Sequence, residues 1–150
     1  MIATPDLTEA TLEWLNDLSP HGILITDAAL IIRGWNRWME LHSGRRAVDV
    51  LGRSLLEAYP ELVERRMDDA YRQALSGQTV VLAHRLHMYL LPMPPSTHEL
   101  NFSQMQQSAR ITPLLRGGQV IGTLTTIDDV TERVVKERMT CASWPTSVCC

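Results

Sequence analysis

The side chains of this chain that could perform chemistry are few, and they form no recognisable catalytic set. Five histidines and three cysteines could bind a metal ion or act as base or nucleophile. The cysteines all fall in the last ten residues, at Cys141, Cys149 and Cys150. No His/Cys quartet with zinc spacing accompanies them, and no carboxylate pair or Ser/His/Asp arrangement can be assembled elsewhere. The sequence therefore predicts neither a catalytic site nor a metal site.

The histidines are best interpreted through the elements that carry them. In "VVLAHRLHMYL" apolar residues alternate as in a half-buried strand, which predicts that His84 and Met88 face the core and that His87 faces away. His42 follows Trp38 at helical spacing and is also expected to point inward. A single inward histidine is usually a hydrogen-bonded core residue, so axial ligation by His84 or His42 is the minor alternative. His21 and His98 are expected to be solvated.

Aromatic, methionine and histidine side chains could line an internal ligand pocket. The candidates are Trp38, His42, Met67, Tyr71, His84 and Met88. The same side chains could simply fill the space between sheet and helices, and this interpretation is favoured because no convergent polar groups mark a pocket.

The order of the elements indicates an α+β fold. We expect an amphipathic helix over residues 6–18, strands at 23–26 and 30–33, short helices after Asn36, and a longer helix from about 61 to 75. A long strand over 79–91, a Pro-rich loop over 92–104 too polar for the core, and strands at 105–115 and 119–128 follow. Gly117-Gly118 predicts a hairpin between the last two. This order predicts one five-stranded antiparallel sheet with helices inserted between its second and third strands.

The amino-acid composition and charge limit the classes of function that the chain could have. The 150 residues carry a net charge of −3 and no basic block, so nothing favours nucleic acid or an anionic membrane as a partner. No apolar run reaches the roughly 20 residues of a membrane span, and the N-terminus lacks the basic and apolar regions of a signal peptide. A cytoplasmic location is expected.

Three motifs in order resemble a PAS domain, the sensory box module of bacterial signalling proteins. "ITDAALIIRGWNRWMELHSG" resembles the opening hairpin and the Asn that starts the first helix. "SGRRAVDVLGRS" resembles the Ser/Thr-Gly and Leu-Gly-Arg-Ser pattern, and "DDVTER" resembles the closing motif, at Asp129, Val130, Thr131, Glu132 and Arg133. The resemblance implies an N-terminal helix over 1–20, a PAS domain over 21–128, the start of a signalling helix over 129–139 and a disordered tail over 140–150.

The closing motif has a physical interpretation of its own. Asp129 and Glu132 can cap a helix that starts where the last strand ends, while Lys136 and Arg138 suit its far end. Val130, Val134/Val135 and Met139 form a narrow apolar stripe that would suit the first turns of a parallel coiled coil. A terminal helix that packs back on its own sheet is the alternative.

The resemblance implies a regulatory, non-enzymatic module that passes a ligand- or partner-induced change through this helix to a downstream effector. A histidine kinase is the effector that the resemblance favours. Alternatives are a diguanylate cyclase-linked (GGDEF) sensor, a haem- or flavin-binding redox sensor, or a free-standing dimerisation adaptor. Photosensory relatives carry a Cys in the helical region and haem-binding ones a His on the long helix; this chain has neither there. We therefore predict no particular cofactor, and expect a homodimer with a small molecule as one candidate signal.

Overall fold

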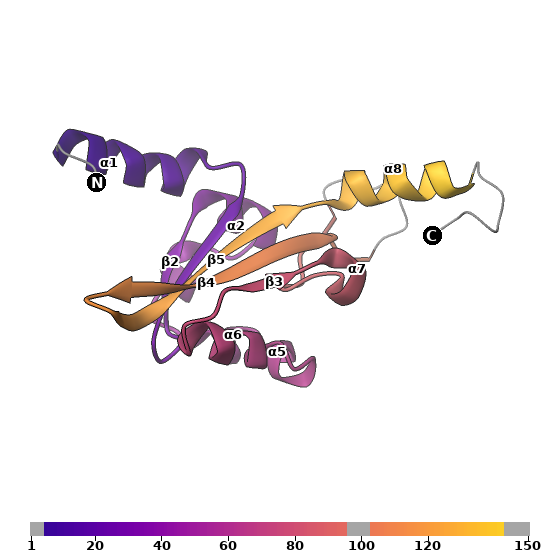
Figure 1. Cartoon of the computed structure of the whole chain (residues 1–150). Coiled ribbons are helices and arrows are strands. Elements are labelled where there is room, and N and C mark those ends of the chain that lie inside the picture. The colour runs from indigo at the N-terminus through magenta and orange to yellow at the C-terminus, as the bar shows by residue number, and fades with distance from the viewer. Residues whose placement is uncertain (1–4, 96–102, 143–150) are drawn as a thin grey trace.

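The computed structural model describes residues 5–95 and 103–142 as one antiparallel sheet with helices inserted between its second and third strands (Figure 1). The strands are β1 (Gly22–Asp27), β2 (Ile32–Trp35), β3 (Val80–Leu82), β4 (Gln107–Arg116) and β5 (Gln119–Asp129), in the spatial order β2-β1-β5-β4-β3. The predicted fold class and strand connectivity are confirmed. The predictions made for residues 1–4, for His98 and for residues 143–150 concern positions outside the described part of the chain.

The helices between β2 and β3 cover one face of the sheet. They are α2 (Arg37–Ser43), α3 (Ala47–Val50), α4 (Leu55–Ala58), α5 (Glu61–Glu64) and α6 (Asp68–Leu75). α2 packs on β1, and α6 packs on β4 and β5. Alternate strand residues such as Leu24, Ile111 and Ile127 are fully buried beneath them, which follows from the two-residue period of a strand. The core therefore lies between this helical layer and the sheet.

Asn36 explains how the first helix is oriented on the sheet. Its Oδ1 accepts hydrogen bonds from the N–H groups of Met39 and Ile23, and its Nδ2 donates to the carbonyls of Leu15 and His21. The amide is buried yet satisfied on both sides, so it caps α2 and also ties that helix to β1.

Gly117 and Gly118 join β4 to β5 as predicted. Both have positive φ, +60° and +79°, which a tight hairpin turn requires and which glycine adopts without steric cost.

Two predicted elements were wrong in extent. The helix expected over 61–75 is broken into α5 and α6, because Arg66 adopts a left-handed φ of +60° and Met67 donates its N–H to the carbonyl of Leu62. The break lets Leu62 and Met67 both enter the core. The strand expected over 79–91 ends at Leu82, and α7 (His84–His87) follows it.

The Pro-rich loop was also misjudged. It was expected to be too polar for the core, yet Met93 is buried, and so is Met105, which donates its N–H to the carbonyl of Met93. Apolar residues within a polar loop therefore supply part of the core in place of the missing length of β3.

The described chain has one helix near each end, and the two extend in opposite directions, α1 to the left and α8 to the right in Figure 1. α1 (Pro5–Glu13) continues as a π-helical turn, Trp14–Leu18, in agreement with the predicted N-terminal helix. α8 (Thr131–Ala142) follows β5 after one residue and includes the predicted start of the signalling helix. The division into domains stays a prediction.

Candidate functional site

Tyr71 and Met67, two of the six pocket candidates, lie in the core. Tyr71 is fully buried on α6, and its hydroxyl shares a 2.9 Å hydrogen bond with the hydroxyl of Thr125 on β5. Burial raises the pKa of the Tyr71 phenol above its ordinary value, and the bond to Thr125 opposes this only in part. The pair therefore links the helical layer to the strand that leads into α8.

Trp38 and His42 form a second group, on α2. Their rings lie 4.1 Å apart between centroids and both side chains are half-buried. Burial lowers the pKa of His42, and the negative charge of Asp129 opposes that shift. The charge of Asp129, at the end of β5, therefore influences the pKa of His42, although the two residues are far apart in the sequence.

His84 and Met88 do not join the other candidates. Because β3 ends at Leu82, the strand alternation that predicted them to face inward does not apply. His84 lies half-buried on α7, where burial lowers its pKa and the charges of Glu137 and Arg133 on α8 act in opposite directions. Met88 has 57% of its surface exposed. The structure therefore divides the six candidates into a core pair, an α2 pair, His84 close to charges on α8, and the exposed Met88.

The junction between β5 and α8 is held by hydrogen bonds at each successive residue. Asp129 Oδ1 accepts the Thr131 N–H at 3.0 Å. Val130 donates its N–H to the carbonyl of Gln106, and Thr131 Oγ1 accepts the N–H of Gln106 at 2.9 Å. Val130, Thr131 and Val134 are buried, whereas Glu132 and Arg133 are exposed.

The first turn of α8 is therefore seated on the start of β4 through Gln106, and it is capped by Asp129 as the sequence predicted. Glu132 does not cap the helix in the described contacts but forms an exposed ion pair with Lys136 at 3.5 Å. The role of the five motif residues in signal transmission stays a prediction.

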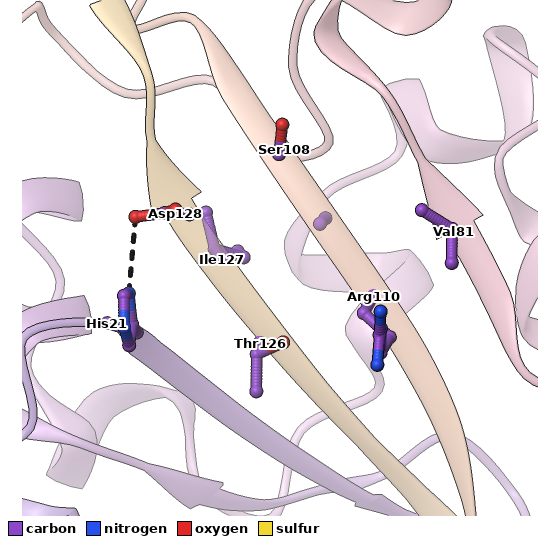
Figure 2. Close-up of a pocket in the computed structure, with 8 residues that line it drawn as sticks. His21, Val81, Ser108, Arg110, Thr126, Ile127 and Asp128 are labelled. Carbon is purple, nitrogen blue, oxygen red and sulfur yellow. Dashed lines mark hydrogen bonds and ion pairs between the residues drawn. The ribbon is translucent and has the colours of Figure 1, made fainter.

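A shallow groove of about 340 Å³ opens on the face of the sheet that the inserted helices leave uncovered (Figure 2). It is lined by His21, Val81, Ser108, Ala109, Arg110, Thr126, Ile127 and Asp128. At one edge His21 Nδ1 lies 3.2 Å from Asp128 Oδ1, and Figure 2 shows Arg110 on the neighbouring strand.

Sequence reasoning missed this groove; it predicted a solvated His21, which is exposed and also contacts Asp128. The available signal was the outward parity of Ser108 and Arg110 on one strand and of Thr126 and Asp128 on the next. Strand pairing brings these positions together, because Arg110 lies opposite Thr126 and Ser108 opposite Asp128.

The described residues contain no group of three or more metal-binding side chains, and none of their helices is long and apolar enough to cross a membrane. Among them, the candidate features are a buried core, an outer groove lined by both polar and apolar residues, and a terminal helix whose first turn is hydrogen-bonded to the sheet.

Comparison with known proteins gives the same architecture. A family model described as a PAS fold matches residues 17–135. No curated protein matches the chain. Among solved structures, the chain is similar to a sensory box sensor histidine kinase from Vibrio cholerae, with 20% identity and a TM-score of 0.54 over 84% of this chain and 92% of that chain.

Two further structures have larger TM-scores. An RNA-binding Light-Oxygen-Voltage receptor is 20% identical, with a TM-score of 0.64 over 89% of this chain and 35% of that chain. A Vibrio cholerae VqmA dimer in the absence of target DNA is 19% identical, with a TM-score of 0.62 over 87% and 53% of the two chains. At these identities the likeness concerns the fold.

Proposed function

The chain belongs to the PAS family, and we propose that it is the sensory module of a bacterial signal-transduction protein, regulatory rather than catalytic and located in the cytoplasm. A ligand or partner that prefers one arrangement of sheet and helices would shift the position of α8, and α8 would pass that shift to a downstream effector. The proposal is supported mainly by the hydrogen bonds at the start of α8. Asp129, Val130 and Thr131 are each hydrogen-bonded, so no unbonded residue separates β5 from the helix.

A histidine kinase is the first effector to test, because a sensory box histidine kinase is among the structures that this chain resembles. A diguanylate cyclase remains the second. The other two structures are an RNA-binding receptor and a VqmA dimer described in the absence of its target DNA, so an effector that binds nucleic acid is a third alternative.

Effector output in the intact protein tests the proposal. Thr131→Val removes the hydroxyl that accepts the N–H of Gln106 and should change the basal output or its response to signal. Arg116→Ala, at the opposite end of the sheet beside the Gly117-Gly118 turn, is the matched control and should leave output unchanged. Equal output from wild type and Thr131→Val, with both proteins folded, would refute a signalling role for the junction.

We also propose a homodimer, with α1 and α8 as its contacts. Leu7, Leu12 and Leu18 are exposed on the N-terminal helix and its π-helical turn, and Met139 is exposed on α8. One structure of similar fold is described as a dimer. The molar mass measured by light scattering should be twice that of the chain, and Leu12→Glu should lower it; a wild-type monomer at all concentrations would refute the dimer.

The core is proposed to admit a small molecule between the sheet and the helices, with haem and flavin as the cofactors of the redox-sensor alternative. Native mass spectrometry of the purified protein would reveal added mass, and a visible absorbance spectrum would distinguish a chromophore from a colourless ligand. If the measured mass equals that of the polypeptide, and incubation with a metabolite extract adds no mass, the alternative that side chains alone fill the core would be favoured.

A further inference from the structure

The segment from Ala83 to Leu91, which contains α7 and is called here the α7 segment, is held by one side chain from the helical layer. Arg65, just after α5, donates to the carbonyl oxygens of His87 at 3.0 Å, Leu90 at 3.2 Å and Tyr89. Its guanidinium carbon also lies 4.0 Å from the centroid of the Tyr89 ring. One half-buried cation thus satisfies three carbonyl groups within residues 87–90 of an irregular backbone.

The backbone that Arg65 holds is strained. Met88 has φ +65° and ψ −55°, and the N–H of Tyr89 donates to the carbonyl of His87 at 2.7 Å. This is a classic γ-turn, a rare and strained conformation for a residue with a side chain. Such a conformation persists only when its surroundings hold it, and it occurs preferentially at functional and switch regions.

The sequence of the same segment favours a different conformation. Residues 80–90 alternate as an extended strand, and the observed state leaves Leu86 81% and Met88 57% exposed. Extending the pairing of Leu82 with Ala109 by two residues would place His84 opposite Gln107. In the observed state Gln107 instead binds the segment, accepting the N–H groups of Leu90 and Leu91 through Oε1.

Arg65 also has an alternative partner within reach. Glu61, one turn earlier, presents a buried Oε1 that has no hydrogen bond and lies 3.9 Å from Arg65 Nη1. A buried carboxylate oxygen with no hydrogen bond is costly, and Arg65, already at ion-pair distance in an i,i+4 arrangement, could come closer and donate to it. Two acceptor sets therefore compete for the same guanidinium.

The α7 segment touches the helix that carries the proposed output. Arg85 Nη2 lies 3.6 Å from Glu137 Oε2 on α8, and His84 lies near enough to α8 to be influenced by Glu137 and Arg133. A change in the segment would therefore remove a lateral contact from α8 about two turns after its start.

We propose that Arg65 is a positioning residue that holds the α7 segment in a strained state against α8, and that its transfer to Glu61 releases the segment to extend β3 and frees α8. This inference rests on the proposed output role of α8. It adds a second route to α8, from the helical layer through α7, beside the direct continuity of β5.

Amide hydrogen exchange followed by NMR on the full chain tests the inference. Arg65→Met keeps much of the apolar stem and removes the hydrogen-bond donors. It should increase the amide exchange rates of Leu86, Met88 and Tyr89 about tenfold or more, because the loss of one hydrogen bond to a charged group changes an opening equilibrium by about that factor. Exchange in residues 135–139 should also increase. Backbone chemical shifts of residues 84–87 should move from helical toward extended values.

Arg45→Met is the matched control. Arg45 likewise donates to a backbone carbonyl, that of Ala58 at 2.8 Å, and lies 4.3 Å from the centroid of the Tyr59 ring, but these partners are the last residue of α4 and the residue after it. It should leave exchange in α7 and α8 unchanged. Unchanged exchange of these amides in Arg65→Met, or random-coil rather than extended shifts, would overturn the switch.

Substitutions at Met88 give an independent test with opposite signs. Met88→Gly tolerates positive φ and should slow exchange in the α7 segment, whereas Met88→Val, which is β-branched and disfavours that φ, should speed it. Changes of the same sign would overturn the strained-turn argument. None of these readouts requires an effector, so their failure leaves the sensory proposal standing, and failure of the effector test leaves the exchange results intact.

Discussion

Removal of the phenolic hydroxyl of Tyr71 tests whether the helical layer is energetically coupled to β5. The Tyr71 and Thr125 hydroxyls are fully buried and lie 2.9 Å apart. Tyr71→Phe deletes one partner and leaves the other hydroxyl buried without its hydrogen bond. That loss should lower the free energy of unfolding by about 1–2 kcal/mol. In a domain of this size the change corresponds to a decrease of about 2–8 °C in melting temperature.

The double-mutant cycle with Thr125→Val makes the prediction sharper. Thr125→Val should cost a similar amount, since the phenol then lacks its partner. The double variant replaces both polar groups by apolar groups of nearly the same shape, so it should be more stable than the sum of the single losses predicts, by about 1 kcal/mol. Urea denaturation of all four proteins measures this difference.

Thr126→Val is the control for the cycle, because Thr126 neighbours Thr125 on β5 but faces the outer groove. Combined with Tyr71→Phe, it should give additive losses. If the Tyr71/Thr125 pair were also additive, the hydroxyls would not be coupled, and the claim that α6 is linked to β5 through them would fail.

Three other predictions follow from contacts described above. Asp129→Ala should cost about 1 kcal/mol and speed amide exchange at the start of α8, because it removes the acceptor of the Thr131 N–H, while the exposed Asp49→Ala on α3 should not affect α8. Gly122→Ala should abolish folding, as judged by circular dichroism and yield, because its Cβ would lie 2.1 Å from the Thr26 carbonyl oxygen. Gly34→Ala would place its Cβ 2.9 Å from the Ile25 Cβ, a less severe contact, and should lower stability but still fold. The pKa of His42 and that of His84 are lowered mainly by burial, so the unfolded chain binds more protons as pH falls through the ordinary value of 6.5, and stability should decrease there. His42→Gln should reduce that decrease in urea midpoints between pH 7.5 and 5.5, and a midpoint that rises as pH falls would contradict the assignment.

The parts of the fold that short-range patterns determine were predictable. The opening hairpin, the Asn36 helix start, the Gly117-Gly118 turn and the cap at Asp129 each depend on residues close together in the sequence. The antiparallel arrangement was also predictable, because hairpins at both ends of the chain fix the relative direction of their strands. These features need no knowledge of distant contacts.

The errors arose where tertiary contacts override local preference. Residues 83–91 have the alternation of a strand, but Arg65 and Gln107 hold them in another conformation. The break at Arg66 likewise depends on the burial of Leu62 and Met67 together. The outer groove was missed because its residues become neighbours only through strand pairing.

The geometry of the β5–α8 junction limits how α8 can respond. Gln107 still pairs with Asp129 at the last position of the sheet, so only Val130 separates a paired strand from the helix, and its N–H is bonded to Gln106. A change in the twist or position of β5 must therefore move the first turn of α8. Beyond that turn the helix extends away from the sheet, and Met139 is 69% exposed (Figure 1). A helix fixed at its first turn converts a small rotation there into a larger displacement further along, where Met139 is exposed.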